Sequence, residues 1–156
     1  MRDTALEEDE EIWYHANASP MMSRMLPLLT WNQAEKWSEL FENFKPSDAK
    51  IWVACLIMHG PRTFALTVTD ESMYDPDAVR TFSSDHYIYV DPDAEITQDS
   101  IMLIRHENGN LAFRQLFVSS DGKPMFRSIN PDWVEEPFEA KRETEVFGVV
   151  IGKTLP

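Results

Sequence analysis

The sequence is poor in cysteine, in glycine and in long apolar runs. Its single cysteine, Cys55, cannot form a disulfide within the chain, which suits a reducing cytosol. There are five glycines and neither GxxxxGK[ST] nor GxGxxG occurs, so a phosphate-cradling nucleotide loop is not supported. No apolar run approaches the ~18 to 20 residues of a membrane span, and the N-terminus is acidic where a secretory signal would be basic. We therefore expect a cytoplasmic protein without a membrane partner.

Positive charge is also scarce. The 14 Lys and Arg residues are outnumbered by 27 Asp and Glu residues, and the net charge of -13 would repel a phosphate backbone. Direct DNA binding by this chain is therefore not expected. The histidines, His15, His59, His86 and His106, are scattered without metal-ligand spacing, and the acidic pairs lie in turn-like segments. We expect neither a metal nor a cofactor.

The chain divides into a short acidic start and one domain. Residues 1–20 are strongly acidic and predict a flexible arm, because like charges this dense seldom pack. The rest, 21–156, is rich enough in apolar residues for a single core. Within it, "NQAEKWSELFENF" places its apolar side chains at helical spacing and predicts one short helix of about three turns.

Beyond this helix the pattern changes to short strands. The runs are rich in β-branched and aromatic residues and are, in order, "TFALTV", "DHYIYVD", "SIMLIRHE", "NLAFRQLFV", "KPMFRSI" and "TEVFGVVIG". "ENGN" and "SDGK" predict hairpin turns, since Asn-Gly and Asp-Gly tolerate the positive φ that such turns require. The fold class predicted is mainly β, with a bent antiparallel sheet or partial barrel and one short N-terminal helix.

Several of these segments, taken in order, resemble one family. The segments are "TFALTVTDESM", "SSDHYIYVDPD", "LAFRQL", "RSINPDW" and "EVFGVVIG", and upstream of them lies "LPLLTWNQAEKW". Together they resemble the C-terminal domain of LexA, of lambda-type phage repressors and of UmuD, which are self-cleaving serine-lysine peptidases. The resemblance implies the bent sheet of that family, related to signal peptidase, over most of the chain.

The resemblance also implies which residues would carry the chemistry. Ser72 falls at the position of the nucleophile, and Arg114 falls at the position of the lysine base. A guanidinium stays protonated, so Arg114 cannot act as that base, although it could donate a hydrogen bond to Ser72. The cleavage-like site is Ala34 followed by Glu35, where the family has glycine. We expect a degenerate and inactive dyad, and we expect Arg114→Lys with Glu35→Gly to restore cutting.

The function expected from this resemblance is regulatory rather than enzymatic. The domain would form a homodimer, or a heterodimer with an intact repressor, in phage or SOS-type transcriptional control, or it would act as a decoy for the RecA filament. Residues 1–20 are too few and too acidic for a helix-turn-helix domain. Three alternatives remain open: a self-cleaving serine peptidase with a base other than lysine, an acidic DNA-mimic inhibitor, and a fragment of a longer repressor.

Overall fold

Strands dominate the computed structural model, which describes residues 24–154. The acidic arm predicted for residues 1–20 lies outside this range. Within 24–154, no helix is long and apolar enough to cross a membrane. The helical elements are α2 (Trp31–Glu35), α3 (Trp37–Leu40), η1 (Phe41–Asn43) and η2 (Pro46–Asp48). The strands are β1 (Met25–Pro27), β2 (Trp52–Ala54), β3 (Phe64–Thr67), β4 (Tyr87–Asp91), β5 (Ile101–Arg105), β6 (Leu111–Val118), β7 (Pro124–Arg127), β8 (Phe138–Glu139) and β9 (Val146–Thr154).

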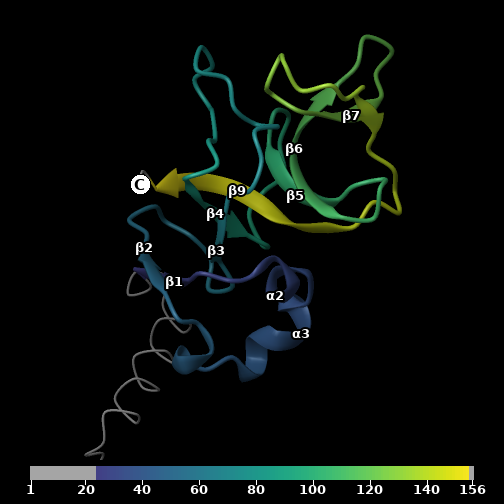
Figure 1. Cartoon of the computed structure of the whole chain (residues 1–156). Helices are drawn as coiled ribbons and strands as arrows, with labels where there is room; N and C mark the ends of the chain where they lie inside the picture. The colour runs from purple at the N-terminus through teal and green to yellow at the C-terminus, as the bar shows by residue number, and fades with distance from the viewer. Residues whose placement is uncertain (1–23, 155–156) are drawn as a thin grey trace, which may run out of the picture.

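Seven of the strands form one bent antiparallel sheet. Its order is β3-β4-β9-β5-β6-β7-β8, and its two edges do not pair with each other. Figure 1 shows β5, β6 and β7 curling away from β3 and β4, while the long strand β9 crosses between the two halves. β1 and β2 form a separate two-stranded sheet, which joins β3 through a bridge between Leu28 and Ala65. The predicted class, mainly β with a bent antiparallel sheet or partial barrel, is confirmed, and the sheet does not close.

Both predicted hairpin turns are present. The turn between β5 and β6 contains Gly109 at φ 90°, and the turn between β6 and β7 contains Gly122 at φ 86°. Both angles lie in the left-handed region that favours glycine, as the sequence predicts. One further residue of the described chain has a positive φ without being glycine, namely Asp99 at φ 70°, in the turn before β5. Asp tolerates this conformation better than most residues.

The single helix predicted over "NQAEKWSELFENF" is wrong in its continuity. Lys36, at φ -108° and ψ 12°, separates α2 from α3, and its N–H bonds to Gln33 at 3.1 Å in place of a regular helical partner. The indole N–H groups on either side explain the break, because each is tied to a different carbonyl. Trp31 donates to Thr67 at 3.1 Å and Trp37 donates to Arg62 at 2.7 Å.

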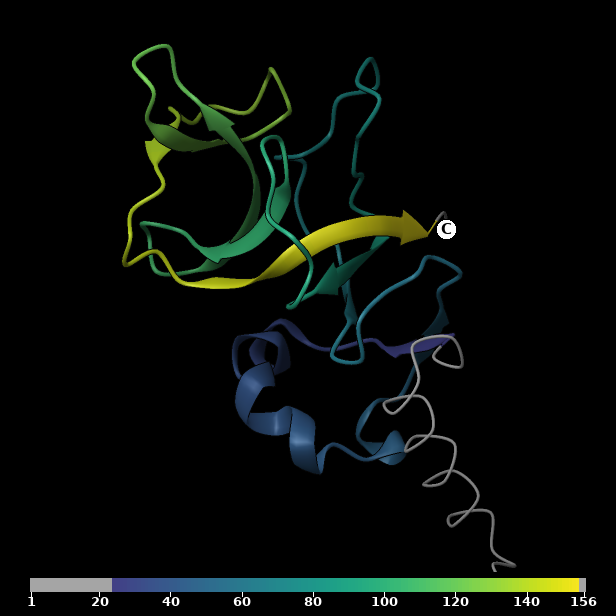
Figure 2. The same ribbon diagram turned by 180° about the vertical axis from the view of Figure 1, so that it is seen from behind.

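The helical segment nevertheless buries the face that its spacing predicts. The indole of Trp37 packs edge-on against Phe44 and Phe64, with ring centroids 4.9 and 5.8 Å apart. In Figure 2 the helices lie below the sheet, so this packing joins them to β3. A smaller apolar cluster holds β1 and β2 against β3 and β4, and it includes the buried Cys55.

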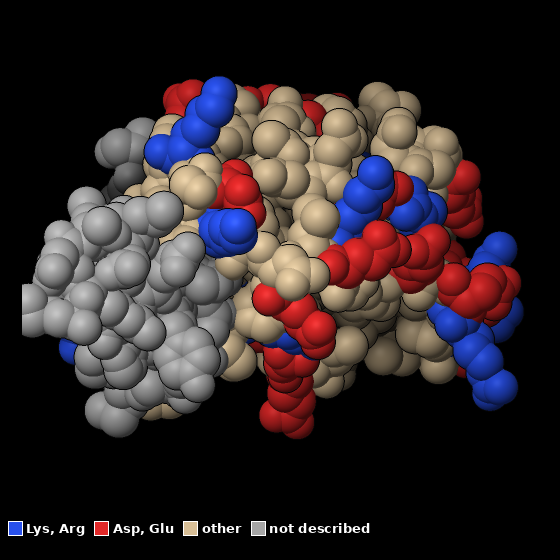
Figure 3. All heavy atoms as spheres, turned by 90° about the horizontal axis from the view of Figure 1, so that it is seen from below, with Lys and Arg blue, Asp and Glu red and all other residues tan. Residues whose placement is uncertain are grey.

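The surface carries charges of both signs. On the face shown in Figure 3, the Lys and Arg side chains are interspersed with those of Asp and Glu. Six of the 27 acidic residues fall within the first 20 positions of the sequence, outside the described range. The net charge of -13 therefore does not appear as a uniformly acidic surface on this face.

Candidate functional site

Ser72 lies in the turn that follows β3 and is fully buried, at 0% exposure. The carboxylate of Asp70 accepts hydrogen bonds from the Ser72 N–H at 2.9 Å and from the Ser72 hydroxyl at 2.6 Å. A side chain bonded to the backbone two residues on is the geometry of an Asx turn. The carbonyl of Ser72 accepts from the N–H groups of Ile129 and Asn130, at 3.1 and 3.0 Å. Side-chain and main-chain bonds therefore both fix this turn.

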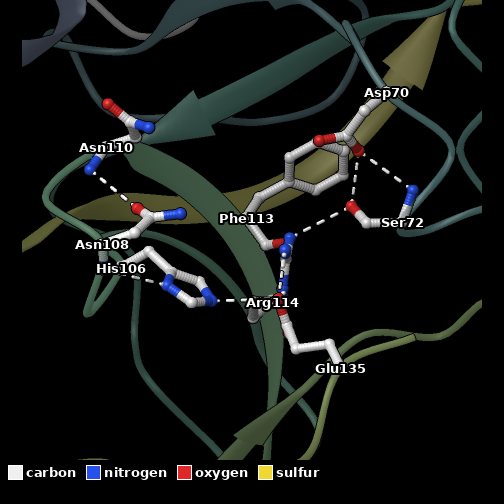
Figure 4. A network of polar contacts seen from close by, with 8 residues as sticks. All are labelled: Asp70, Ser72, His106, Asn108, Asn110, Phe113, Arg114 and Glu135. Carbon is white, nitrogen blue, oxygen red and sulfur yellow. Dashed lines mark hydrogen bonds and ion pairs between the residues drawn. The ribbon is translucent and has the colours of Figure 1, made fainter. Parts of the chain in front are cut away.

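Arg114 reaches Ser72 from the middle of β6. Its Nη1 donates to the Ser72 hydroxyl oxygen at 3.0 Å and to the carbonyl of Phe113 at 2.8 Å, and the residue is only 3% exposed. Its Nε and Nη2 donate to the two carboxylate oxygens of Glu135 at 2.8 and 3.0 Å, so that this ion pair is bidentate (Figure 4). The structure thus brings Ser72 and Arg114 together, and it places a carboxylate on the far side of the guanidinium.

His106 completes the network at its outer end. Its Nε2 lies 2.9 Å from Glu135 Oε1, and its Nδ1 lies 3.3 Å from the N–H of Asn108. Because a backbone N–H can only donate, Nδ1 is the acceptor, and Nε2 is the ring nitrogen placed to donate to Glu135. Burial raises the pKa of Glu135, but the bonds from Arg114 and His106 outweigh burial and bring this pKa below its ordinary value. Glu135 is therefore charged at neutral pH.

The hydrogen bonds decide what this serine can do chemically. A serine attacks a carbonyl group only after a base removes its proton. Here the Ser72 hydroxyl donates to Asp70 and accepts from Arg114. Arg114 is a donor only, and a carboxylate is a weak base toward a hydroxyl. The arrangement is well suited to holding the turn, and Asp70 is the group placed to accept the proton.

The cleavage-like site is held in a helix. Ala34 lies within α2 and is 1% exposed, and the helix begins at a capping box between Thr30 and Gln33. The Glu35 carboxylate forms an ion pair with Arg105 at 2.8 Å. Among the described residues, no hydrogen bond or ion pair joins Ala34 or Glu35 to Ser72 or Arg114. Proteolytic cutting favours exposed loop tips, which Ala34 is not.

An open pocket lies between α2 and the turn that joins β5 to β6. Its volume is about 270 Å³, and it is lined by Trp31, Asn32, Glu35, Thr69, Gly109, Asn110 and Leu111. Arg105 borders this region, because its guanidinium bonds to both Glu35 and the carbonyl of Gly109, at 2.8 and 2.9 Å. The pocket is therefore framed by the cleavage-like segment on one side and, on the other, by the β5–β6 hairpin, which carries His106 and Arg114.

The network around Ser72 and Arg114 contains three residues that the sequence does not predict as part of the site, namely Asp70, His106 and Glu135. The sequence shows Asp70 as a member of one of the acidic pairs in turn-like segments, and His106 as one of the scattered histidines. Glu135 lies in "NPDWVEEPF", where its neighbour Glu136 has the same chemical character but is exposed. Nothing in the sequence distinguishes the inward carboxylate from the outward one. Within residues 24–154, no group of three or more His, Cys, Asp and Glu side chains is placed to hold a metal ion.

A bent antiparallel sheet in which the serine turn after β3 meets a cation from β6 defines a peptidase-like domain of the repressor type. Residues 27–151 match the family model described as Peptidase S24-like, and the chain belongs to this family. The resemblance to the LexA, phage-repressor and UmuD group is thereby confirmed.

Named relatives are regulators of transcription. The chain is 27% identical to the HTH-type transcriptional regulator for conjugative element SXT of Vibrio cholerae, over 87% of the chain and 62% of that protein. The same figures hold for the regulator for conjugative element R391 of Providencia rettgeri. Repressor protein C2 of Salmonella phage P22 is 25% identical, over 91% of the chain and 63% of that protein. The chain thus spans less than two thirds of the length of these relatives.

Proposed function

We propose that this chain is a non-cleaving S24-like regulatory domain, which acts in transcriptional control of the phage or SOS type by binding a second S24-like domain. That second domain is another copy of the chain or the corresponding domain of an intact repressor. The names of the relatives, a repressor and transcriptional regulators of conjugative elements, support the regulatory part of this proposal. Under this proposal the peptidase-like site is a structural element and the chain is a pseudoenzyme.

The observation that carries the proposal is the set of bonds made by Arg114. A family lysine must lose its proton to activate the serine, whereas Arg114 stays protonated and directs its donors to Ser72, Phe113 and Glu135. The second support is Glu35, whose ion pair with Arg105 gives the residue in the glycine position a role in holding α2. Both departures from the family pattern are thus built into the folded structure.

An exposed apolar segment offers a surface for protein contact. Leu56, Ile57 and Met58 follow one another in the sequence and are 83%, 41% and 85% exposed. Three exposed apolar residues in a row are unusual on a surface that has no partner. The side chain of Ile57 lies against Gly152 of β9, so this segment is continuous with the large sheet. We assign it to contact with the second S24-like domain.

The contact is tested by association measurements on the full chain. Sedimentation measures self-association, and co-purification with a repressor that has both a helix-turn-helix and an S24-like domain measures mixed pairing. Leu56→Ser with Met58→Ser is expected to weaken association at least tenfold. Val79→Ser, at a side chain that is fully exposed (102%) and distant in sequence, should leave it unchanged. A chain that stays monomeric and captures no such repressor would contradict the proposal. Capture by activated RecA alone would favour the decoy role instead.

A second candidate function rests on Asp70. Because the Ser72 hydroxyl lies 2.6 Å from Asp70 Oδ1, a self-cleaving serine peptidase with a carboxylate base is the specific alternative. Incubation at alkaline pH, with and without activated RecA, separates the two functions. We expect an uncut chain under both conditions. Fragments split near Ala34 that vanish in both Ser72→Ala and Asp70→Asn would establish the peptidase.

A further inference from the structure

Glu135 lies where a surface segment turns inward between β7 and β8. Its neighbour Val134 is fully exposed at 100%, whereas the Glu135 side chain is only 16% exposed. Both of its carboxylate oxygens are used, one by Arg114 Nε and the other by Arg114 Nη2 and His106 Nε2 (Figure 4). The segment thus contributes a single charged group to the interior, and that group contacts the residue at the lysine position.

The same segment covers the serine turn. At its start, the N–H groups of Ile129 and Asn130 donate to the Ser72 carbonyl, and the Asn130 side chain donates to the carbonyl of Glu71 at 2.8 Å. At its other end, Glu135 bonds to Arg114, which itself bonds to Ser72. Residues 129–135 are therefore tied to the Ser72 turn at both ends, consistent with the complete burial of Ser72.

Negatively charged groups dominate the surroundings of position 114. Two carboxylates face it, Glu135 directly and Asp70 through the Ser72 hydroxyl, while His106 faces it only through Glu135. Burial alone would lower the pKa of an amine at this position and make it a usable base. An adjacent carboxylate acts in the opposite direction, typically by about 1 to 3 pKa units. The surroundings of position 114 therefore favour a permanent cation.

We propose that Glu135 is a positioning residue that fixes a positive charge at position 114 and holds residues 129–135 over Ser72. This inference rests on the proposed non-cleaving function and identifies what keeps the site in that state. It also revises an expectation from the sequence. Arg114→Lys with Glu35→Gly should leave the chain uncut, because Glu135 and Asp70 would keep the introduced amine protonated.

The test compares three variants of the full chain: Arg114→Lys alone, with Glu135→Gln, and with Glu136→Gln. Glu136 is the matched control, because it is adjacent, carries the same charge and is exposed. The pKa of the amine introduced by Arg114→Lys is measured by NMR on chains labelled at the lysine ε-carbon. We expect a pKa above the ordinary value of about 10.4 in the first and third variants, and a fall of at least about one unit with Glu135→Gln. A purely structural role would not move this pKa, and equal values in all three would overturn the inference.

A second measurement covers the case in which the lysine variants do not fold. In the Arg114 background, Glu135→Gln and Glu136→Gln are compared by hydrogen exchange at the Ile129 and Asn130 amides. We expect at least tenfold faster exchange with Glu135→Gln and no change with Glu136→Gln; equal protection would overturn the positioning role. Self-cleavage of the unmodified chain would instead contradict the proposed function, so the two failures are distinguishable.

Discussion

His86, immediately before β4, is a buried histidine with a depressed pKa. Its Nδ1 accepts from the N–H of Ser83 at 3.1 Å, and the residue is 8% exposed. Burial lowers the pKa of His86, and the nearby Lys153 lowers it further, while Asp85 opposes them. The unfolded chain therefore binds a proton at a higher pH than the folded chain does. The contribution of neutral His86 to the free energy of unfolding is complete above the unfolded pKa of about 6.5. It is lost as the pH falls from that value through the folded pKa.

We predict that His86→Asn flattens this pH dependence. An Asn side chain can still accept from Ser83 but does not titrate near neutral pH. Thermal unfolding between about pH 7.5 and 5 is expected to show a falling midpoint for the native chain and a smaller fall for the variant. Parallel curves would assign the acid sensitivity to other groups. Glu135, whose pKa is lowered, contributes only below the ordinary glutamate pKa of about 4.3.

Cys55 should be chemically inert in the folded chain. The residue is 2% exposed, and burial raises the pKa of its thiol, although a weak bond to the carbonyl of Ile57 partly offsets this. Because the thiolate is the reactive species, we predict reaction with a disulfide reagent at least about a hundredfold slower than in the unfolded chain. Following thiol release with and without denaturant measures the ratio. Comparable rates would mean that the β1–β2 sheet opens readily.

Glu135 and Glu136 show where prediction from sequence ends at this scale. Ser72 and Arg114 could be placed from the order of the family-like segments, because strand pattern and turn residues fix where those segments lie. The carboxylate that contacts Arg114 could not, since two adjacent glutamates in a polar segment are equivalent until the fold turns one of them inward. Asp70 is likewise visible in the sequence as an acidic turn residue but not as the acceptor for Ser72.

At the level of elements, the pattern of β-branched and aromatic residues predicted the longer strands and missed the shortest ones. All six predicted runs contain a strand of the large sheet, because their β-branched and aromatic side chains fill its two faces. The three missed strands, β1, β2 and β8, have two or three residues each, too few for alternation to be visible. The predicted helix failed in continuity because two tryptophans anchor its halves to different carbonyls.

The close approach between β9 and the end of β4 depends on Gly148. A Cβ at this position would lie 2.5 Å from the side chain of Val90 and 3.2 Å from the backbone of Asp91 and Pro92. Backbone cannot move aside as a flexible side chain can, so Gly148→Ala is expected to destabilise the fold by about 2 to 3 kcal/mol. Chemical denaturation with a linear extrapolation gives this value.

Gly152→Ala, on the same strand, provides the comparison. Its new methyl group would first meet the far end of the Ile57 side chain, which can change rotamer, and we expect a cost below about 1 kcal/mol. If the two substitutions lower the free energy of unfolding equally, crowding against the backbone at the end of β4 is not the reason for a glycine at position 148.

For the whole molecule, the net charge of -13 gives opposite predictions for the possible modes of association. Two copies of this chain repel each other at long range, so salt should relieve that repulsion and leave an apolar contact equally tight or tighter. An acidic mimic of DNA would instead bind a basic partner, and its affinity should fall steeply with salt, as the affinity of proteins for DNA does. The interspersed charges in Figure 3 favour the first mode on that face.

We therefore predict that self-association, or pairing with an S24-like domain of similar charge, does not weaken between about 50 and 500 mM salt, because screening shortens the reach of like-charge repulsion. Sedimentation at several salt concentrations measures this for the full chain, and Leu56→Ser with Met58→Ser shows whether the retained affinity depends on the exposed apolar segment. A decrease in affinity of a hundredfold or more over this range of salt concentration would exclude an apolar contact as the main one. It would restore the DNA-mimic alternative. If salt instead tightens the complex and the double substitution abolishes it, the acidic surface opposes association and the apolar segment provides it.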